Sequence, residues 1–198
     1  MSRIANISAA LLLGGASTRM GRDKARLELR GEPAAAQLAR LLAGLFEEVL
    51  LVGGDPPAEA PGRRVPDRAF SACALRGVAS ALAAAREERV LVLATDPMAM
   101  TPDLLLALAA YPAADAVVPR AAGFAQPLCA LYRRAPALAA AERCLASESL
   151  ALTSLLAQLD VRWLEGGDLA AIDPEGTALG NINTPDDYAR LLARESAA

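Results

Sequence analysis

The sequence contains no histidine, and this absence excludes several common kinds of catalytic site. Neither a Ser-His-Asp triad nor a Cys-His pair can form, and a metal site built on imidazole ligands is excluded as well. Any metal should therefore be a hard cation that is held by oxygen ligands. If the protein is an enzyme, its reaction proceeds without a histidine as base or nucleophile.

Cysteines and long apolar runs are also scarce. The three cysteines, Cys73, Cys129 and Cys144, are odd in number and lack the spacing of metal ligands, so we expect them to be reduced. No apolar run approaches the roughly 18 residues that a membrane span requires, and no long apolar signal region stands at the start. These features predict a cytoplasmic protein that has no membrane partner.

Basic residues are not in excess. The chain has 20 lysines and arginines against 23 aspartates and glutamates, which gives a net charge of -3. Broad binding to nucleic acid is not expected at this balance. The 198 residues are 54% hydrophobic, which suits one compact α/β domain with a substantial core over residues 1–198.

Strand-like apolar runs alternate with segments of helical periodicity. The predicted strands are residues 7–13, 48–52, 64–66, 90–94, 114–118, 128–132 and 161–164. The predicted helices are residues 33–45, 75–86, 102–110, 136–145, 153–159 and 184–192, and Thr101 is expected to cap the third of them. This order predicts a three-layer α/β/α fold with a mainly parallel, Rossmann-like sheet that is covered on both faces. Ligands of such sheets bind beyond the carboxyl ends of the strands.

The most informative segment lies at residues 11–25, which read Leu-Leu-Leu-Gly-Gly-Ala-Ser-Thr-Arg-Met-Gly-Arg-Asp-Lys-Ala. An apolar run ends in Gly14 and Gly15, and glycines allow backbone amides to approach an anion closely. Arg19 and Lys24 then add positive charge, which suits phosphate groups. We interpret the segment as a polyphosphate site at the end of the first strand.

Two common phosphate-binding motifs do not fit this segment. A Walker A loop has four residues between its glycines and ends in Lys-Ser/Thr, whereas five residues separate Gly15 from Gly21, and Ala25 follows Lys24. A dinucleotide fingerprint needs Gly-x-Gly, whereas Gly14 and Gly15 are adjacent. A glycine-rich turn with solvated cations is the simpler alternative, but two cations and a further glycine at fixed offsets favour phosphate.

The segment resembles the signature of the molybdenum cofactor guanylyltransferases, which belong to the nucleotidyltransferases with a Rossmann-like fold. The matching residues are Leu12, Gly14, Gly15, Ser17, Arg19, Met20, Gly21, Asp23 and Lys24. The resemblance implies Mg²⁺-dependent transfer of GMP from GTP to the terminal phosphate of molybdopterin, with release of pyrophosphate. It also implies that Arg19 and Lys24 contact the triphosphate as catalytic residues, and that nucleotide binding involves Leu12, Leu13, Gly14, Gly15, Ser17 and Lys24.

Asp96 follows the most strand-like run of the chain, residues 90–94. A carboxylate at the end of a central strand is well placed to hold Mg²⁺ against phosphate oxygens, although an aspartate that caps a turn would occupy the same place. The family has Cys-Asp-x-Pro here, with the aspartate as metal ligand, whereas residues 95–98 read Thr-Asp-Pro-Met. We therefore expect Asp96 to be the catalytic, nucleotide-binding and metal-binding carboxylate, and the turn after it to differ from that of the family.

Asp67 and Gly77 are further candidates for nucleotide binding. The family has an aspartate at the place of Asp67, but a turn after Pro66 explains this residue equally well. Gly77 ends the segment Cys-Ala-Leu-Arg-Gly at residues 73–77, where the family has Gly-Pro-Leu-x-Gly. Because the first glycine and the proline are replaced, recognition of the base is open.

The acceptor side of the resemblance lies in the second half of the chain. Gln126-Pro127 matches a His-Pro or Gln-Pro step of the family, and residues 181–185 match its Asn-x-Asn-Thr-Pro motif. We therefore expect Gln126, Asn181 and Asn183 near the acceptor, while the Thr-Pro that follows also fits a plain helix start. A basic residue that the family often has near residues 149–153 is absent.

The resemblance thus implies a nucleotide half at about residues 1–110 and an acceptor half at about residues 111–198 of a single domain. GTP and molybdopterin would be the substrates, and molybdoenzymes or their chaperones would be protein partners. One alternative is a related enzyme with another base or acceptor, such as a molybdopterin cytidylyltransferase or a cobamide-precursor guanylyltransferase. A non-catalytic cofactor-binding accessory protein is the other, but the intact Arg19, Lys24 and Asp96 argue against it.

Overall fold

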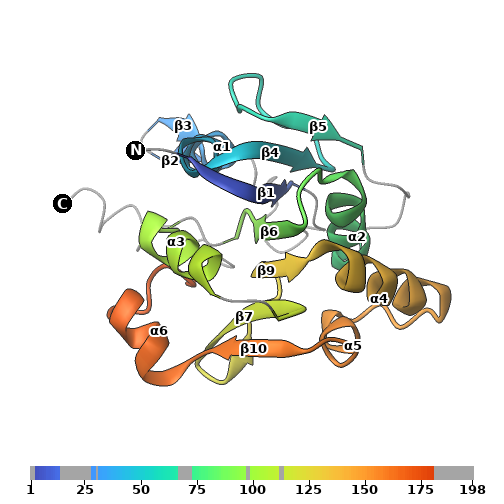
Figure 1. Cartoon of the computed structure of the whole chain (residues 1–198). Coiled ribbons are helices and arrows are strands. Elements are labelled where there is room, and N and C mark those ends of the chain that lie inside the picture. The colour runs from blue at the N-terminus through green and yellow to red at the C-terminus, as the bar shows by residue number, and fades with distance from the viewer. Residues whose placement is uncertain are drawn as a thin grey trace.

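The computed structural model describes residues 3–13, 28–29, 31–66, 73–96, 99–111 and 114–180. A sheet with the strand order β10-β7-β9-β6-β1-β4-β5 forms its centre (Figure 1). These strands are β1 (Ile4–Leu12), β4 (Phe46–Val52), β5 (Arg63–Val65), β6 (Arg89–Ala94), β7 (Ala116–Ala121), β9 (Cys129–Arg133) and β10 (Val161–Leu164). The short strand β8 (Phe124–Ala125) pairs with β7, while β2 (Glu28–Leu29) and β3 (Glu32–Pro33) form a separate ladder.

Strand β9 runs against the other six strands of this row. It pairs antiparallel with β6 and β7. The parallel pairs are β1 with β4, β1 with β6, β4 with β5, and β7 with β10. Because β9 is reversed, its first residue, Cys129, lies beside Leu93 near the end of β6. The turn that precedes β9 therefore reaches the edge of the sheet at which the parallel strands end.

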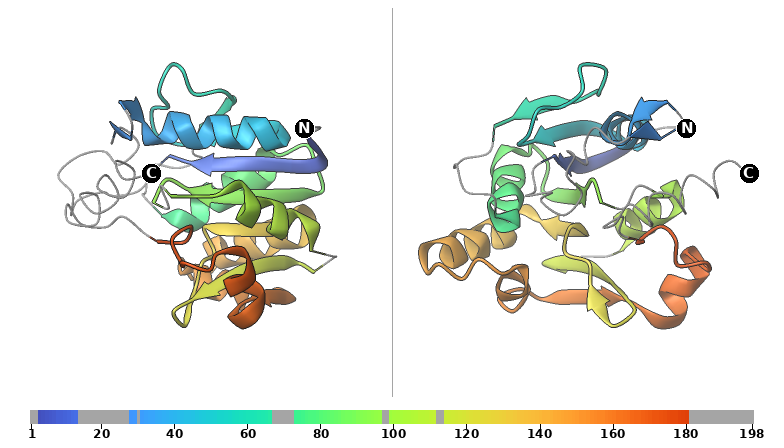
Figure 2. Two further views of the ribbon diagram at one scale, coloured as in Figure 1. Left: turned by 90° about the vertical axis from the view of Figure 1, so that its left-hand side faces the viewer. Right: turned by 180° about the vertical axis from the view of Figure 1, so that it is seen from behind.

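The sheet is apolar on both faces. In β1, Ile7, Ala9 and Leu11 belong to the core on one face, and Ala10 and Leu12 belong to the core on the other. Helices α1 (Ala34–Leu45), α3 (Pro102–Ala110) and α6 (Gly166–Ile172) cover the first face, and α2 (Ala74–Ala84), α4 (Arg134–Ala146) and α5 (Leu152–Leu156) cover the second (Figure 2). Burial on both faces explains why the strands read as continuous apolar runs, and it confirms the predicted three-layer fold.

Some local predictions differ from the structure. Helix α6 was not predicted. It contains no fully buried residue, and its sequence therefore lacks the clear apolar face by which a helix is recognised. Helix α5 ends at Leu156, before the predicted boundary at 159, and β7 continues to Ala121. Thr101 stands at the start of α3, but its side chain makes no capping hydrogen bond, so that part of the prediction is wrong. The predicted helix at 184–192 lies outside the described residues.

A polar network around Glu48 closes the amino-terminal edge of the sheet. The Glu48 carboxylate accepts hydrogen bonds from Ser8 Oγ at 2.6 Å, the Arg86 backbone N–H at 2.9 Å and Arg63 Nη2 at 2.9 Å. Burial by itself raises the pKa of Glu48, but these hydrogen bonds and the charge of Arg63 outweigh it and hold the pKa below the ordinary 4.5. The carboxylate is thus stabilised in its ionised form.

None of the helices within the described ranges is long and apolar enough to cross a membrane. All three cysteines, Cys73, Cys129 and Cys144, are free.

Candidate active site at the carboxyl-terminal edge of the sheet

The ends of three neighbouring strands are tied together at this edge. The Leu13 backbone N–H donates to the Val52 carbonyl at 2.9 Å, and the Gly53 N–H donates to the Val65 carbonyl at 2.9 Å. Leu12 and Leu13 thus lead the chain directly to Gly14, where the predicted phosphate loop begins. The loop residues Gly14, Gly15, Ser17, Arg19 and Lys24 lie outside the described part of the chain, as do Asp67, Asn181 and Asn183.

Gly54 packs against the last described residue before that loop. Its φ is +54°, and a Cβ on Gly54 would come within 2.9 Å of both the Cβ and the carbonyl oxygen of Leu13. A side chain is therefore disfavoured both by the backbone conformation and by the close approach of Leu13. This contact holds the Leu13 backbone in place immediately before Gly14.

Gly77 lies in the first part of α2, next to β1. A Cβ at this position would lie 3.5 Å from Leu12 Cδ1, which is an ordinary van der Waals contact. Packing between α2 and β1 therefore does not require a glycine at residue 77. Nucleotide binding, for which the sequence makes Gly77 a candidate, is not tested by this contact, so the role of Gly77 stays a prediction.

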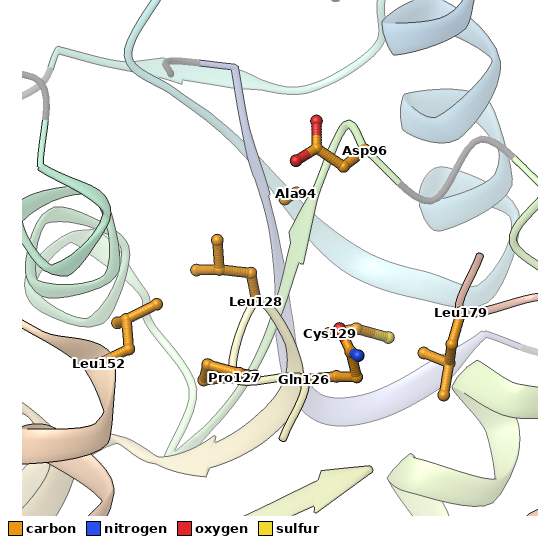
Figure 3. Close-up of a pocket in the computed structure, with 8 residues that line it drawn as sticks. All are labelled: Ala94, Asp96, Gln126, Pro127, Leu128, Cys129, Leu152 and Leu179. Carbon is orange, nitrogen blue, oxygen red and sulfur yellow. The ribbon is translucent and has the colours of Figure 1, made fainter. Parts of the chain in front are cut away.

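A pocket of about 130 Å³ lies beyond the end of β6 (Figure 3). Its lining residues are Ala94, Asp96, Gln126, Pro127, Leu128, Cys129, Leu152 and Leu179. The Asp96 carboxylate stands past the last residue of β6, while Gln126 lies on the turn that enters β9 (Figure 3). The structure thus brings together Asp96, which the sequence assigns to the metal, and Gln126, which it assigns to the acceptor side.

The turn that carries Gln126 is fixed by backbone hydrogen bonds. The Gln126 N–H donates to the Pro119 carbonyl at 2.8 Å, and the Gln126 carbonyl accepts from the Cys129 N–H at 2.9 Å. The Leu128 carbonyl accepts from the Ala94 N–H at 2.8 Å, which joins the turn to the end of β6. The antiparallel direction of β9 makes these bonds possible, and they hold Gln126 on the same side of the sheet as Asp96.

Two side chains of β9, Tyr132 and Cys129, are buried next to the same turn. The Tyr132 hydroxyl donates to the Pro127 carbonyl at 2.7 Å, and burial raises the pKa of Tyr132. Burial also raises the pKa of the Cys129 thiol to about 12, so this pocket residue is protonated at neutral pH. A protonated, buried thiol is a poor nucleophile, so Cys129 is not suited to covalent catalysis.

Sequence reasoning missed Leu152 and Leu179, which form apolar parts of the pocket wall. Leu152 is the first residue of α5, and Leu179 lies after α6; they stand on opposite sides of the pocket (Figure 3). No local motif marks either residue, because a leucine at a helix start or in a turn has no distinct signature. Both leucines reach the pocket wall only because the second half of the chain folds back onto the sheet.

The donor atoms of the pocket suit a metal that is shared with a substrate. No group of three or more acidic or cysteine side chains that could hold a metal ion occurs in the ranges that the structure covers. Asp96 contributes the acidic side chain among the lining residues. Mg²⁺ at nucleotide sites is commonly held by one or two carboxylates together with phosphate oxygens and water. A single carboxylate in the described lining thus fits a Mg²⁺ that also takes ligands from phosphate oxygens and water.

Comparisons with known sequences agree with this arrangement. A family model described as the MobA-like NTP transferase domain matches residues 9–162. A probable molybdenum cofactor guanylyltransferase of Chloroflexus aggregans is 38% identical over 198 residues, and the match covers 94% of each chain. A protein of Opitutus terrae with the same name is 37% identical, and the match covers 93% of this chain and 94% of the relative.

Solved structures share the fold. The molybdopterin-guanine dinucleotide biosynthesis protein A of Archaeoglobus fulgidus has a TM-score of 0.82 at 23% identity, with 96% of this chain and 100% of that chain covered. The 2-C-methyl-D-erythritol 4-phosphate cytidylyltransferase of Thermus thermophilus has a TM-score of 0.71 at 19% identity, with 98% and 100% covered. Together with the match to the family model over most of its length, these likenesses lead to one conclusion: the chain belongs to the MobA-like NTP transferase family.

Proposed function

We propose that this protein is a molybdenum cofactor guanylyltransferase, which transfers GMP from GTP to the terminal phosphate of molybdopterin and releases pyrophosphate. The observation that carries the proposal is the Asp96 carboxylate at the end of β6, in one pocket with Gln126. Relatives with this name that match over nearly the whole chain support these substrates.

The transfer is an in-line displacement at phosphorus. An oxygen of the acceptor phosphate forms a bond to the α-phosphorus of GTP, and the bond from that phosphorus to the pyrophosphate oxygen breaks. This reaction needs no protein nucleophile, in keeping with the lack of histidine and with the buried, protonated Cys129. Positioning and charge neutralisation then supply most of the catalysis, and we assign both to Arg19, Lys24 and Asp96.

Mg²⁺ belongs to this proposal as a cofactor. When bound, it would neutralise charge on the phosphate oxygens that surround the reacting phosphorus. We assign Asp96 as its protein ligand, because the carboxylate stands beyond the end of a central strand whose hydrogen bonds hold its backbone in place. The remaining nucleotide contacts in the proposal come from Leu12, Leu13, Gly14, Gly15, Ser17, Asp67 and Gly77.

In this proposal, the two substrates would meet at the pocket. Residues 1–110 or so would hold the nucleotide, and residues from about 111 to 198 would hold the acceptor, within a single domain. Asp96 comes from the first of these halves, whereas Gln126, Leu152 and Leu179 come from the second. Asn181 and Asn183 complete the proposed acceptor side, since they follow Leu179 closely in the sequence.

Product formation from different nucleotides tests the proposal. Purified protein with Mg²⁺ and molybdopterin receives GTP, CTP or ATP, and both pyrophosphate and the dinucleotide product are measured. We expect turnover with GTP, and only when molybdopterin is present. Preference for CTP would identify a molybdopterin cytidylyltransferase, and turnover of GTP only with a cobamide precursor would identify that related enzyme. No turnover with any combination would favour the accessory protein.

Protein partners and location complete the proposal. Molybdoenzymes or their chaperones would receive the product, and the cytoplasm would be the site of the reaction. Affinity purification of the native protein, combined with cell fractionation, checks both statements.

A further inference from the structure

Asp173 is a buried acidic residue that takes no part in the proposed chemistry. It directly follows α6 and is only 9% exposed. Within the described ranges its carboxylate has no cationic partner, and backbone N–H groups supply its hydrogen bonds. Burial of a carboxylate destabilises the folded protein unless hydrogen bonds replace its contacts with water. The backbone donors around Asp173 supply such bonds, and their arrangement calls for a structural or functional reason.

The Asp173 carboxylate binds a turn four and five residues further on. Its Oδ1 accepts from the Thr177 N–H at 3.0 Å, and its Oδ2 accepts from the Ala178 N–H at 3.0 Å. The Asp173 main chain takes part as well, because its N–H donates to the Leu169 carbonyl at 2.9 Å and its carbonyl accepts from the Gly176 N–H at 3.0 Å. One residue therefore joins the end of α6 to the following turn through both its side chain and its backbone.

This turn places Leu179 in the wall of the pocket. Leu179 is buried and lines the pocket together with Asp96 and Gln126, on the side next to Cys129 (Figure 3). Leu179 belongs to neither a helix nor a strand; it lies in a turn that the Gly180 N–H closes by donating to the Thr177 carbonyl at 3.0 Å. The position of this part of the wall thus depends on the turn.

Apolar packing supports the turn through its own residues Ala178 and Leu179, which are buried in the core, whereas α6 adds little. Helix α6 has no fully buried residue, and only Leu169 and Ile172 pack partly against the core. Hydrogen bonds to an ionised carboxylate are stronger than those between neutral groups, and two of them fix adjacent N–H groups in one geometry. Loss of the carboxylate would leave the buried Ala178 N–H and the partly buried Thr177 N–H without this acceptor.

We infer that Asp173 is a positioning residue for the acceptor substrate: its carboxylate holds the turn at 177–180 so that Leu179 shapes the acceptor side of the pocket. The inference rests on the proposed function, because the acceptor is molybdopterin only if that function is correct. Asp173 acts through the turn and does not touch the reacting atoms. The same turn ends at Gly180, and the predicted acceptor residue Asn181 follows it in the sequence.

Steady-state kinetics of matched variants test the inference. Asp173→Ala removes both acceptors, and Asp173→Asn keeps one carbonyl oxygen. Glu175→Ala is the control, since Glu175 is an exposed acidic residue between Asp173 and the turn. We expect Asp173→Ala to raise KM for molybdopterin about tenfold while KM for GTP changes less than about twofold, with Asp173→Asn intermediate and Glu175→Ala unchanged.

A purely structural role would give a different pattern. If Asp173→Ala lowers the thermal unfolding midpoint but leaves both KM values unchanged, or raises both equally, the inference is wrong. If that variant does not fold, Leu179→Ala takes its place: it should raise KM for molybdopterin selectively, and an unchanged value overturns the inference. Lack of turnover by the wild-type protein overturns the proposed function and this inference with it, whereas wild-type turnover with unaffected variants overturns the inference alone.

Discussion

The two edges of the central sheet place carboxylates in different surroundings. At the amino-terminal edge, the Glu48 carboxylate is enclosed by donors from Ser8, Arg63 and Arg86, which join β1, β4, β5 and the chain before β6. At the carboxyl-terminal edge, Asp96 and Gln126 border a pocket whose other walls are apolar. The comparison teaches where to look for an effect: a carboxylate that joins several elements of the fold is tested by stability, and the proposed role of a carboxylate that lines a pocket is tested by activity.

The strongest test of this comparison is Asp96→Asn. We expect turnover to fall about 10²- to 10³-fold, because the neutral amide no longer holds a cation against the phosphate oxygens, while the unfolding midpoint changes little. Pyrophosphate release at several Mg²⁺ concentrations measures the effect. The control is Asp103→Asn, which neutralises an exposed aspartate at the start of α3 and should retain wild-type turnover. Normal turnover by the Asp96→Asn variant would show that Asp96 is not part of the active site.

The second test concerns Gly54, which lies close to Leu13 at the carboxyl-terminal edge of the sheet. Gly54→Ala should lower the free energy of unfolding by about 2–4 kcal/mol, because the alanine has to adopt a positive φ and its Cβ meets the Leu13 backbone. Chemical denaturation measures the loss. At a temperature at which the variant is still folded, KM for GTP should rise, since Leu13 leads into the predicted phosphate loop. An equally stable variant would contradict the close packing.

Glu48→Gln tests the opposite edge and should affect stability but not catalysis. We expect a loss of about 1–3 kcal/mol in the free energy of unfolding, with turnover per folded molecule unchanged. The pKa of Glu48 is lower in the folded protein than its ordinary 4.5, so the carboxylate stabilises the fold above that pH. This contribution disappears as the pH falls through the folded-state pKa.

The pH dependence gives the control for this variant. Unfolding of the wild-type protein and of Glu48→Gln is followed at neutral pH and at several pH values below 4.5. The two stabilities should converge as the pH falls, because the wild-type carboxyl group then becomes protonated and neutral. A constant difference between them would show that the ionised carboxylate is not the stabilising species.

The smallest expected effect on stability comes from Gly77→Ala. The added Cβ finds ordinary contact with Leu12, and alanine favours a helix over glycine, so stability should rise by about 0.5–1 kcal/mol. If the nucleotide approaches the Gly77 backbone, KM for GTP should rise although the fold becomes more stable. An unchanged KM for GTP would assign Gly77 to the helix alone.

Much of this site can be recognised in the sequence because its residues carry local signals. Asp96 stands two residues after an apolar run that is predicted as a strand, and Gln126 precedes another such run next to a proline. Leu152 and Leu179 carry no comparable signal, since any buried leucine produces the same pattern. Asp173 was missed for a related reason: an aspartate before a proline suggests a turn, but not which amide groups its carboxylate will bind.

Local patterns were thus sufficient for the layers of the fold, for the apolar strands and for the strand end that carries Asp96, because burial on both faces of a sheet leaves its mark along each strand. The direction of β9 was not contained in those patterns, since a strand buried on both faces reads alike in either direction. Tertiary folding reversed β9, and that reversal brought the turn with Gln126 to the edge where β6 ends. The pocket depends on contacts between segments as far apart as Asp96 and Leu179, and such contacts form only when the whole chain packs onto one sheet.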